Sequence, residues 1–402
     1  MQAIVQTVLQ KMGTLSQPHL KVMTTLLMTI LLLCGKVNFT NLSRYSPLSE
    51  KTYRRFFAKG FNFCRFNQIL IEQQVPENHG LLAVMDASFN PKSGKKTFGL
   101  DFFYNGCRGQ MERGLEASLI AVVDCVTRAS YALNVQQTYA QQQNPLLTRT
   151  DYALIHLSVT RQYLAQRVRY LAVDAAYATH PFITGAVGMN LQVISKLRQN
   201  ANLRYGYSGE QNPRGRPRKY DGKVDFSDVS RLLYVKSLDG DEDGIHLYTQ
   251  VVWHVSLKRM ICLVYLLDQR KPDQTRYALL FSTDLNQSAE EILEFYRLRF
   301  QIEFIFRDAK QFTGFSDCQA RNENALDFHL NVSLMALNVA RAEQRSLVGA
   351  EELSILSMAS VKRRALNDYL LDLFIDKLGL CRTLIKSHIN FQDLRNHGVI
   401  RA

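Results

Sequence analysis

The sequence predicts an α/β protein with helical segments at both ends, and three observations carry this prediction. Residues 1–75 lack strand patterning and read as helical. Residues 78–342 alternate short apolar runs with helical patterns, which is typical of an α/β core. Within that core, residues 198–283 form a basic segment followed by β-type alternation, which predicts a small antiparallel insertion. Residues 343–402 return to helical patterning, so we expect a helical C-terminal region.

Composition limits the class of protein before any motif is considered. The chain has 402 residues and is 46% hydrophobic, so it can bury a sizeable core and is not a disordered protein. Its formal net charge of +13 favours an anionic partner, with nucleic acid the first choice. The alternative is a basic enzyme whose charge has no specific partner.

Cysteine usage and the longest apolar run both favour a cytoplasmic protein. The 7 cysteines are scattered without a Cys-x-x-Cys pair, which argues against a zinc ribbon and against a disulfide framework. The most apolar run covers residues 22–34 and is too short to span a bilayer. We therefore expect it to be a core helix, and we expect no membrane partner.

Near the N-terminus, two helical segments are joined by a short turn. Residues 38–46 and 50–57 flank Pro47-Leu48-Ser49, and Ser49 is placed to cap the second helix. That second helix carries Arg54 and Arg55, and the arrangement resembles a helix-turn-helix whose second helix enters a DNA groove. A packed helical pair with a solvated basic side is the alternative.

Two short apolar runs in the core each end in an aspartate. Residues 81–85 precede Asp86, and residues 169–173 precede Asp174. One such aspartate is usually a turn former or a helix cap. Two of them, with a glutamate downstream, are what a metal-dependent phosphoryl-transfer site at strand ends needs. Other acids compete for this role: Asp101, Asp124, Asp284 and Asp308.

Several further elements are expected from the pattern alone. Strands are predicted at 97–104, 119–126, 231–236, 245–255, 260–267 and 277–283, and helices at 149–168, 327–342 and within 350–385. The Gln-rich stretch 134–148 is predicted to be a surface loop or helix.

Residues 288–315 are predicted to form one long amphipathic helix. Ser288 can cap its N-terminus, and Gly314 is a natural stop. Four polar side chains share a stripe roughly 60° wide at ~100° per residue: Tyr296, Arg299, Glu303 and Lys310. A carboxylate flanked by cations and a phenol suits a metal held beside a phosphate. A solvated charged face is the alternative.

Two features of the insertion could contact DNA. The segment 213–219 carries alternating cations on an extended backbone, a shape that fits a narrow minor groove. Its cations are Arg214, Arg216, Arg218 and Lys219. A flexible solvated linker is the alternative. The only tryptophan, Trp253, is either a core anchor or a surface on which a displaced base stacks.

Taken together, these residues resemble the DDE transposases of bacterial insertion sequences, in the large group named for its fourth founding element. The group's helix signature is Tyr, two residues, Arg, three residues, Glu, six residues, Lys, and the stripe above matches it at every spacing. The chain departs at Phe300, where many members carry Trp. Asp86-Ala87-Ser88, Val173-Asp174, the stretch 194–198 and the Gly-Arg-Pro-Arg-Lys-Tyr stretch ending at Tyr220 are also similar. The resemblance covers roughly residues 78–340.

The resemblance implies a ribonuclease-H-like core and a set of site residues. Asp86, Asp174 and Glu303 are then expected to hold two Mg²⁺ ions, for which Mn²⁺ could substitute. Tyr296 and Arg299 would grip a DNA phosphate, and Lys310 would contact the strand as a point charge. In this reading Trp253 is the candidate for stacking a flipped base.

The implied function is a Mg²⁺-dependent transposase that acts on double-stranded DNA. It would bind the terminal inverted repeats of its element, cleave there and join the 3′-hydroxyls to target DNA, as a homodimer on paired ends. A bacterial, cytoplasmic, nucleoid-associated protein follows from this. Two alternatives stay open: a ribonuclease-H-like nuclease or resolvase without strand transfer, and a DNA-binding regulator whose catalytic site is vestigial.

Overall fold

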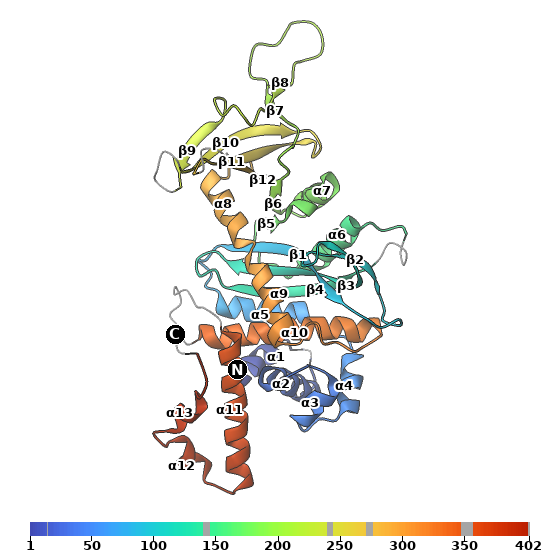
Figure 1. The fold of residues 1–402 in the computed structure, drawn as a ribbon, viewed down its shortest axis with the longest axis vertical. Coiled ribbons are helices and arrows are strands. Elements are labelled where there is room, and N and C mark those ends of the chain that lie inside the picture. The colour runs from blue at the N-terminus through green and yellow to red at the C-terminus, as the bar shows by residue number, and fades with distance from the viewer. Residues whose placement is uncertain (14, 140–144, 239–243, 271–275, 347–356, 401–402) are drawn as a thin grey trace. The chain divides into compact units, whose positions relative to one another are not determined.

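The structure is a computed structural model that falls into two compact units, each assembled from segments distant in sequence. It describes residues 1–13, 15–139, 145–238, 244–270, 276–346 and 357–400. Unit 1 comprises residues 1–79, 87–143 and 301–402, and unit 2 comprises residues 80–86 and 144–300. Consecutive segments 1–75, 78–342 and 343–402 were expected from the sequence, whereas both units are discontinuous. Each unit is described by itself (Figure 1).

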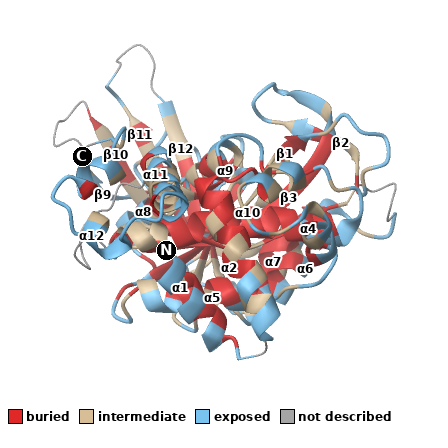
Figure 2. Ribbon diagram, turned by 90° about the horizontal axis from the view of Figure 1, so that it is seen from below, coloured by how far each residue is buried: buried red, intermediate tan, exposed pale blue. Residues whose placement is uncertain are grey.

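Unit 1 begins with a group of helices, as the sequence predicts for residues 1–75. They are α1 (Gln2–Lys11), α2 (Gln17–Leu32), α3 (Phe39–Arg44), α4 (Glu50–Phe57) and α5 (Phe63–Gln74). The apolar run predicted to be a core helix lies mostly in α2, where Leu26, Leu27 and Ile30 are fully buried (Figure 2). Burying one such side chain contributes roughly 2 kcal/mol. Among the described residues, no helix is long and apolar enough to cross a membrane.

In the sheet of unit 1, β3 (Gln110–Asp124) pairs antiparallel with both β2 (Asp101–Asn105) and β4 (Ser130–Thr138). The second half of β1 (Leu81–Pro91) lies next to β3. The prediction of a loop or helix from residue 134 was wrong for 134–138, which belong to β4. Helices α5 and α10 contact this strand, and its first four residues, 130–133, are all buried. The glutamines therefore belong to a covered strand rather than to a surface loop.

The remaining helices of unit 1 come from the C-terminal third of the chain. They are α9 (Gln301–Phe312), α10 (Glu323–Arg345), α11 (Met358–Lys377), α12 (Arg382–Lys386) and α13 (Phe391–Arg395). The predicted helix at 327–342 is confirmed as the central part of α10, which is buried along most of its length (Figure 2). Of the helical stretch expected within 350–385, residues 350–356 lie outside the described residues, and the rest is confirmed as α11 and α12.

Unit 2 combines a parallel part with an antiparallel part. The first half of β1 pairs in parallel with β5 (Tyr170–Val173), and β5 pairs in parallel with β6 (Gln192–Leu197). The helices α6 (Arg149–Arg161) and α7 (His180–Gly188) lie in the connections of this part. The mixed α/β class predicted from the sequence is therefore confirmed, with a sheet that is mostly antiparallel.

The β insertion follows, and the four strands predicted for it are confirmed. They are β9 (Leu233–Ser237), β10 (Ile245–His254), β11 (Arg259–Asp268) and β12 (Arg276–Ser282), all paired antiparallel (Figure 1). Two strands were not predicted: β7 (Leu203–Gly206) and β8 (Tyr220–Lys223), which pair with each other. Strand β7 also pairs with β10, so this basic segment is part of the sheet.

The prediction of one helix over 288–315 was wrong in one respect. The segment forms two helices, α8 (Ala289–Leu298) and α9, separated by a turn at Arg299 and Phe300. The predicted ends are confirmed, because the Ser288 side chain accepts a hydrogen bond from the Glu291 amide and Gly314 has a positive φ of 77°. The four-residue stripe therefore cannot be treated as one helix face.

Candidate active site

Asp86 and Asp174 lie beside each other on parallel strands of unit 2. The last aligned pair of β1 and β5 is Met85 with Val173, so each aspartate follows directly on its own strand. Neighbouring strands are about 4.8 Å apart, so the backbones of the two aspartates lie close together. Asp174 follows the end of β5 as predicted, whereas β1 continues to Pro91, so Asp86 lies inside a strand. It marks the point where the pairing with β5 stops.

Asp174 also performs the local task that a strand-terminal aspartate usually has. One carboxylate oxygen accepts a hydrogen bond from the Ala176 amide at 2.8 Å, which caps the short 3-10 turn Ala175–Tyr177. The backbone carbonyl of Asp174 accepts a hydrogen bond from the Ser195 hydroxyl at 2.8 Å. The other carboxylate oxygen accepts no hydrogen bond from a residue within the described ranges. Capping and metal binding are therefore compatible at this residue.

Arg299 and Tyr296, the first half of the predicted stripe, are brought to Asp86 in unit 2. Arg299 follows the last residue of α8, where a cation interacts favourably with the helix dipole. Its Nη1 atom lies 3.5 Å from Oδ2 of Asp86, and the two side chains are only 13% and 23% exposed. The guanidinium carbon lies 5.7 Å from the centre of the Tyr296 ring. Partial burial makes this ion pair stronger than a surface pair.

Glu303 and Lys310, the second half of the stripe, lie on α9 in unit 1. They are seven residues apart, so they lie within about 20° of each other around the helix. The Lys310 ammonium donates hydrogen bonds to Oγ of Ser88 at 2.7 Å and to the Phe89 carbonyl at 2.9 Å. Burial lowers the pKa of Lys310 from its ordinary value. Sequence reasoning gave Ser88 no role, although its position two residues after Asp86 puts it on the same side of β1.

We expect the Lys310→Met variant to be destabilised, because it removes both donors to β1. Hydrogen bonds from charged groups contribute roughly 1.5–3 kcal/mol, and the Phe89 carbonyl would lose a partner. A loss of about 2 kcal/mol should appear in urea or thermal unfolding of the protein without DNA. Lys51→Met, at an exposed position of α4, is the matched control. Equal stability of the two variants would mean that Lys310 does not fasten α9 to β1.

The competing acids have structural partners. Asp124 accepts hydrogen bonds from Thr127 at 2.6 Å and from His79 at 3.0 Å, and it is almost fully buried. Burial alone would raise the pKa of Asp124, but these hydrogen bonds outweigh it and the pKa lies below its usual value. Asp308 forms an ion pair with Arg307 at 2.9 Å.

The two remaining acids are also engaged. Asp284 accepts a hydrogen bond from the Tyr170 hydroxyl at 2.9 Å. Asp101 lies in β2 of unit 1 and accepts a hydrogen bond from the amide of Phe102. None of these four acids lies where the parallel pairing of β1 and β5 ends, which is the position of Asp86 and Asp174.

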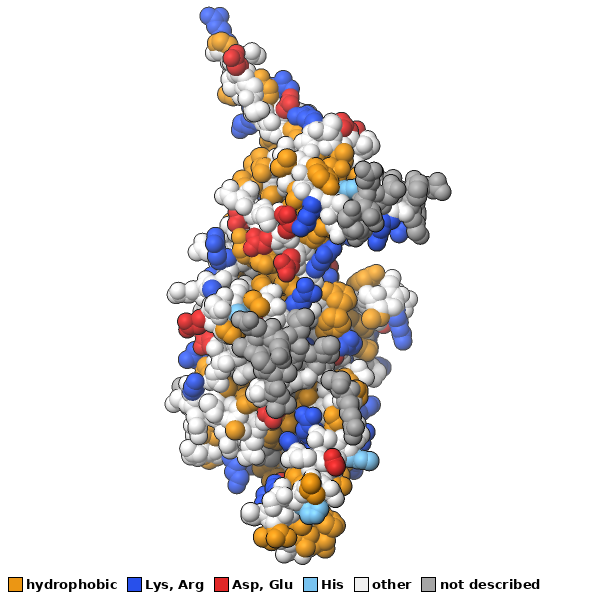
Figure 3. Space-filling model, turned by 90° about the vertical axis from the view of Figure 1, so that its left-hand side faces the viewer, with side chains coloured by type: hydrophobic (Ala, Val, Ile, Leu, Met, Phe, Trp, Pro, Cys, Tyr) orange, Lys and Arg blue, Asp and Glu red, His pale blue; other side chains and the backbone are white. Residues whose placement is uncertain are grey.

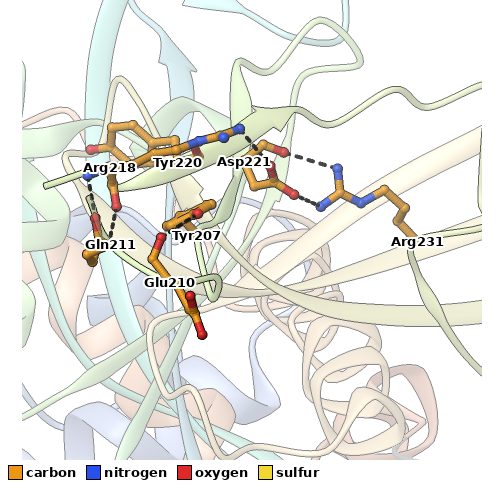
Figure 4. Close-up of polar contacts among 7 residues, drawn as sticks. All are labelled: Tyr207, Glu210, Gln211, Arg218, Tyr220, Asp221 and Arg231. Atoms are coloured by element: carbon orange, nitrogen blue, oxygen red, sulfur yellow. Dashed lines mark hydrogen bonds and ion pairs between the residues drawn. The ribbon is translucent and has the colours of Figure 1, made fainter. Parts of the chain in front are cut away.

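Contrary to the prediction from the sequence, the basic segment 213–219 is not extended throughout, because its backbone bends over residues 213–216. It lies in the loop that closes the β7–β8 hairpin, where Gly215 has a φ of 98°, a conformation that favours glycine. The Gln211 side chain fastens this loop by bonding both the amide and the carbonyl of Arg218, each at 2.8 Å (Figure 4). Arg214 and Arg216 are exposed beyond that closure, and Lys219 is exposed at the start of β8.

Arg218 differs from the other cations of this loop because the protein itself uses its charge. Its Nη2 atom lies 2.9 Å from Asp221, its Nε donates to the Tyr220 carbonyl at 3.1 Å, and its guanidinium covers the Tyr207 ring at 4.6 Å (Figure 4). Asp221 also pairs with Arg231 at 2.7 Å. These contacts hold the hairpin together.

The remaining predicted DNA contacts lie on α4 and β10. Helices α3 and α4 form with the predicted turn between them, and Ser49 caps α4 by accepting from the Thr52 amide. Arg55 is exposed, whereas Arg54 pairs with Glu50 at 3.2 Å and lies over the Phe39 ring.

Trp253 is half-buried rather than fully enclosed. Its ring centre lies 5.7 Å from that of Tyr220 at an interplanar angle of 43°. Its aromatic neighbour is thus supplied by the β7–β8 hairpin, which the sequence did not predict.

Within the described ranges, no group of three or more His, Cys, Asp or Glu side chains is close enough to hold a metal ion. Of the predicted metal ligands, Asp86 and Asp174 are the two that lie side by side, on neighbouring strands of unit 2. Carboxylate oxygens are what hard cations such as Mg²⁺ prefer.

Comparison with known proteins gives two matches to family models. A model described as a transposase DDE domain matches residues 148–339. A model described as a DDE superfamily endonuclease matches residues 16–241, which is more than half of the chain. Asp174 lies in both matched segments, Asp86 in the second and Glu303 in the first. No curated protein matches the chain.

Proposed function

Because the chain belongs to the DDE superfamily of endonucleases, we propose that it is a DNA transposase of a bacterial insertion sequence. In this proposal it binds the terminal inverted repeats of its element, cleaves the DNA there and joins the 3′-hydroxyls to target DNA. The observation that carries the proposal is the placement of Asp86 and Asp174 on adjacent parallel strands. The match to a transposase DDE domain supports it independently.

The proposed metal ligands are Asp86, Asp174 and Glu303. The donor set fits Mg²⁺, or Mn²⁺ as a substitute, because it consists of carboxylate oxygens and Asp174 keeps one of them clear of its capping hydrogen bond. Two bound ions would activate the attacking water or 3′-hydroxyl and stabilise the leaving oxygen. Glu303 enters this set through the Tyr-Arg-Glu-Lys spacing.

Arg299 is proposed to have two partners in turn. In the protein alone its guanidinium pairs with Asp86 and lies against Tyr296. When a cation neutralises Asp86, the guanidinium can turn to a DNA phosphate, which it grips as a bidentate donor. The Lys310 ammonium donates two of its three N–H groups to residues of β1. In this proposal the third N–H group contacts the DNA strand.

The surfaces proposed to bind double-stranded DNA are basic and exposed. They are Arg54 and Arg55 on α4, and Arg214, Arg216 and Lys219 at the β7–β8 hairpin. Arg218 contributes by supporting that hairpin. Trp253, with Tyr220 beside it, is the proposed aromatic surface for a displaced base. A substrate of this kind implies a nucleoid-associated protein in the bacterial cytoplasm.

A homodimer on paired ends is proposed from the C-terminal helices. Large apolar side chains are exposed along α11 to α13, and Figure 3 shows hydrophobic side chains gathered at this end of unit 1. They include Phe374, Leu378, Leu384, Ile389, Leu394 and Ile400. A group of exposed apolar side chains of this size is typical of a protein–protein contact. A second copy of the chain is the partner that paired ends require.

One experiment tests the proposal against its two alternatives. Labelled DNA that carries an inverted repeat is incubated with Mg²⁺ and a supercoiled target plasmid, and joined products are separated on a gel. A transposase gives products in which two ends are joined to one target, as expected of a dimer. Cleavage without joining would identify a nuclease or resolvase, and metal-independent binding without cleavage would identify a vestigial regulator.

A further inference from the structure

Two like charges face each other across the β7–β8 hairpin. Arg204 on β7 is aligned directly with Lys223 on β8, and both side chains are exposed. Like charges at directly opposed positions of a sheet destabilise it. Neither side chain forms an ion pair with any residue in the described part of the chain. The acid on the same hairpin, Asp221, is paired with Arg218 and Arg231 (Figure 4). An anion bound between the two would turn this repulsion into attraction.

The space between these cations is concave. A pocket of about 560 Å³ has four cations in its wall, Arg204, Arg218, Lys219 and Lys223, together with Asn202 and Tyr220. Arg218 is already paired with Asp221, whereas the other three cations and the Asn202 amide offer hydrogen-bond donors, and the wall contains no acidic side chain. The donor set therefore suits an oxyanion of the size of a phosphate.

An aromatic layer beneath the cations orients them. The Arg204 guanidinium lies 5.3 Å from the centre of the Tyr220 ring, and Tyr220 lies against Trp253. Trp253 on β10 is aligned directly with Arg204, so the row Trp253, Arg204 and Lys223 crosses three strands on one face. A guanidinium placed over a ring face by a cation–π contact can still direct N–H groups toward phosphate oxygens.

Asp225 lies two residues after Lys223, and its hydrogen bonds go to Ser227. The Asp225 carboxylate accepts hydrogen bonds from the amide and the hydroxyl of Ser227, at 2.9 and 2.7 Å. The Ser227 hydrogen bonds, and after them the charge of Lys223, lower the pKa of Asp225. Asp225 is not part of the pocket wall, which contains cations and no acid and so suits an anionic partner.

We propose that this face of the hairpin, made by Arg204, Lys219 and Lys223 over Tyr220, binds a backbone phosphate of double-stranded DNA. The inference rests on the proposed transposase function for the identity of the anion. It adds a contact that the Tyr-Arg-Glu-Lys signature does not contain. The contact would anchor the duplex beside the loop that presents Arg214 and Arg216, and so fix where those arginines enter a groove.

The test is the salt dependence of DNA binding by the full chain without divalent cations. For the double variant Arg204→Gln/Lys223→Gln we expect the plot of log association constant against log salt concentration to become less steep. The magnitude of its negative slope should decrease by about 1, as for one lost phosphate contact. At ~0.1 M salt this corresponds to roughly tenfold weaker binding of a labelled duplex. We also expect an unchanged or higher Tm without DNA, because the repulsion between the two charges is removed.

Arg270→Gln is the matched control, since it removes a charge of unit 2 that is already paired with Asp268 at 2.8 Å. An unchanged slope in the double variant, or the same loss in the control, would overturn the proposal. A fall in Tm would mean that the two cations also support the hairpin, and the slope is then measured for Lys223→Gln alone, which leaves the Arg204–Tyr220 contact in place. An unchanged slope in that variant would also overturn the proposal. This test measures DNA binding and not cleavage. Its result can therefore be interpreted even if the protein proves not to be a transposase.

Discussion

Replacing Asp174 by Asn is expected to abolish metal-dependent strand cleavage while leaving the protein folded. The amide lacks the negative charge that a hard cation requires of its ligand. Metal assistance contributes several kcal/mol to such reactions, so the rate should fall roughly a thousandfold or more. The capping hydrogen bond from the Ala176 amide needs only an oxygen acceptor, which Asn retains. Cleavage of an end-bearing duplex in Mg²⁺ measures the effect, and Tm checks the fold.

Asp228→Asn is the control for this variant. Asp228 also accepts a hydrogen bond from the amide two residues on, at 2.9 Å, so the substitution changes the same charge in the same local setting. We expect it to cleave at the wild-type rate. Cleavage by the Asp174 variant at that rate, or an equal loss in both variants, would refute the assignment of Asp174.

Asp86→Asn and Glu303→Gln are expected to behave like the Asp174 variant. The two variants test different parts of the proposal. Asp86 lies beside Asp174 where the pairing of β1 and β5 ends, whereas Glu303 is assigned only by the residue spacing of the Tyr-Arg-Glu-Lys signature. If only Glu303→Gln retained activity, the third ligand would have to be another carboxylate. The strand-edge pair would still stand.

Sequence patterns predicted the elements whose residues are dictated by burial. The apolar runs before Asp86 and Asp174 had to be strands because they are short, β-branched or aliphatic, and end in turn formers. The insertion strands were predicted from the β-type residues along 245–255 and 260–267, and in the structure β10 and β11 are made mostly of buried and half-buried residues. In both cases the local pattern and the tertiary environment agree.

Other features depend on contacts that local patterns do not carry. The turn at Arg299 and Phe300 contains neither glycine nor proline, so helix propensity alone continues through it. The β7–β8 hairpin reads as a linker because it is rich in glycine, proline and arginine. It closes through side chains, namely Gln211 bonded to the Arg218 backbone and Asp221 shared between two arginines.

A second large effect is expected in unit 1, where Asn338→Leu should destabilise the protein by about 3–5 kcal/mol. Among the strands in the described ranges, β4 pairs with β3 alone, so its other edge has no strand beside it. The Asn338 amide on α10 closes that edge by accepting from the Ala132 amide at 2.9 Å and donating to the Ala132 carbonyl at 2.7 Å. It also donates to Asn67 at 2.9 Å, and it is fully buried. Leucine fills the volume but leaves three buried polar groups without partners, each costing roughly 1–3 kcal/mol.

Asn331 repeats the arrangement two turns earlier, where it bonds both the amide and the carbonyl of Val135. The two asparagines together act as a neighbouring strand would, and this explains why α10 carries them seven residues apart at buried positions. Hydrogen exchange separates local from global effects: in Asn338→Leu the Ala132 amide should lose protection while the Val135 amide keeps it. Asn324→Leu, at an exposed position in the first turn of α10, should leave both amides protected and Tm unchanged. Equal protection of Ala132 in both variants would show that the β4 edge is held by packing and not by these amides.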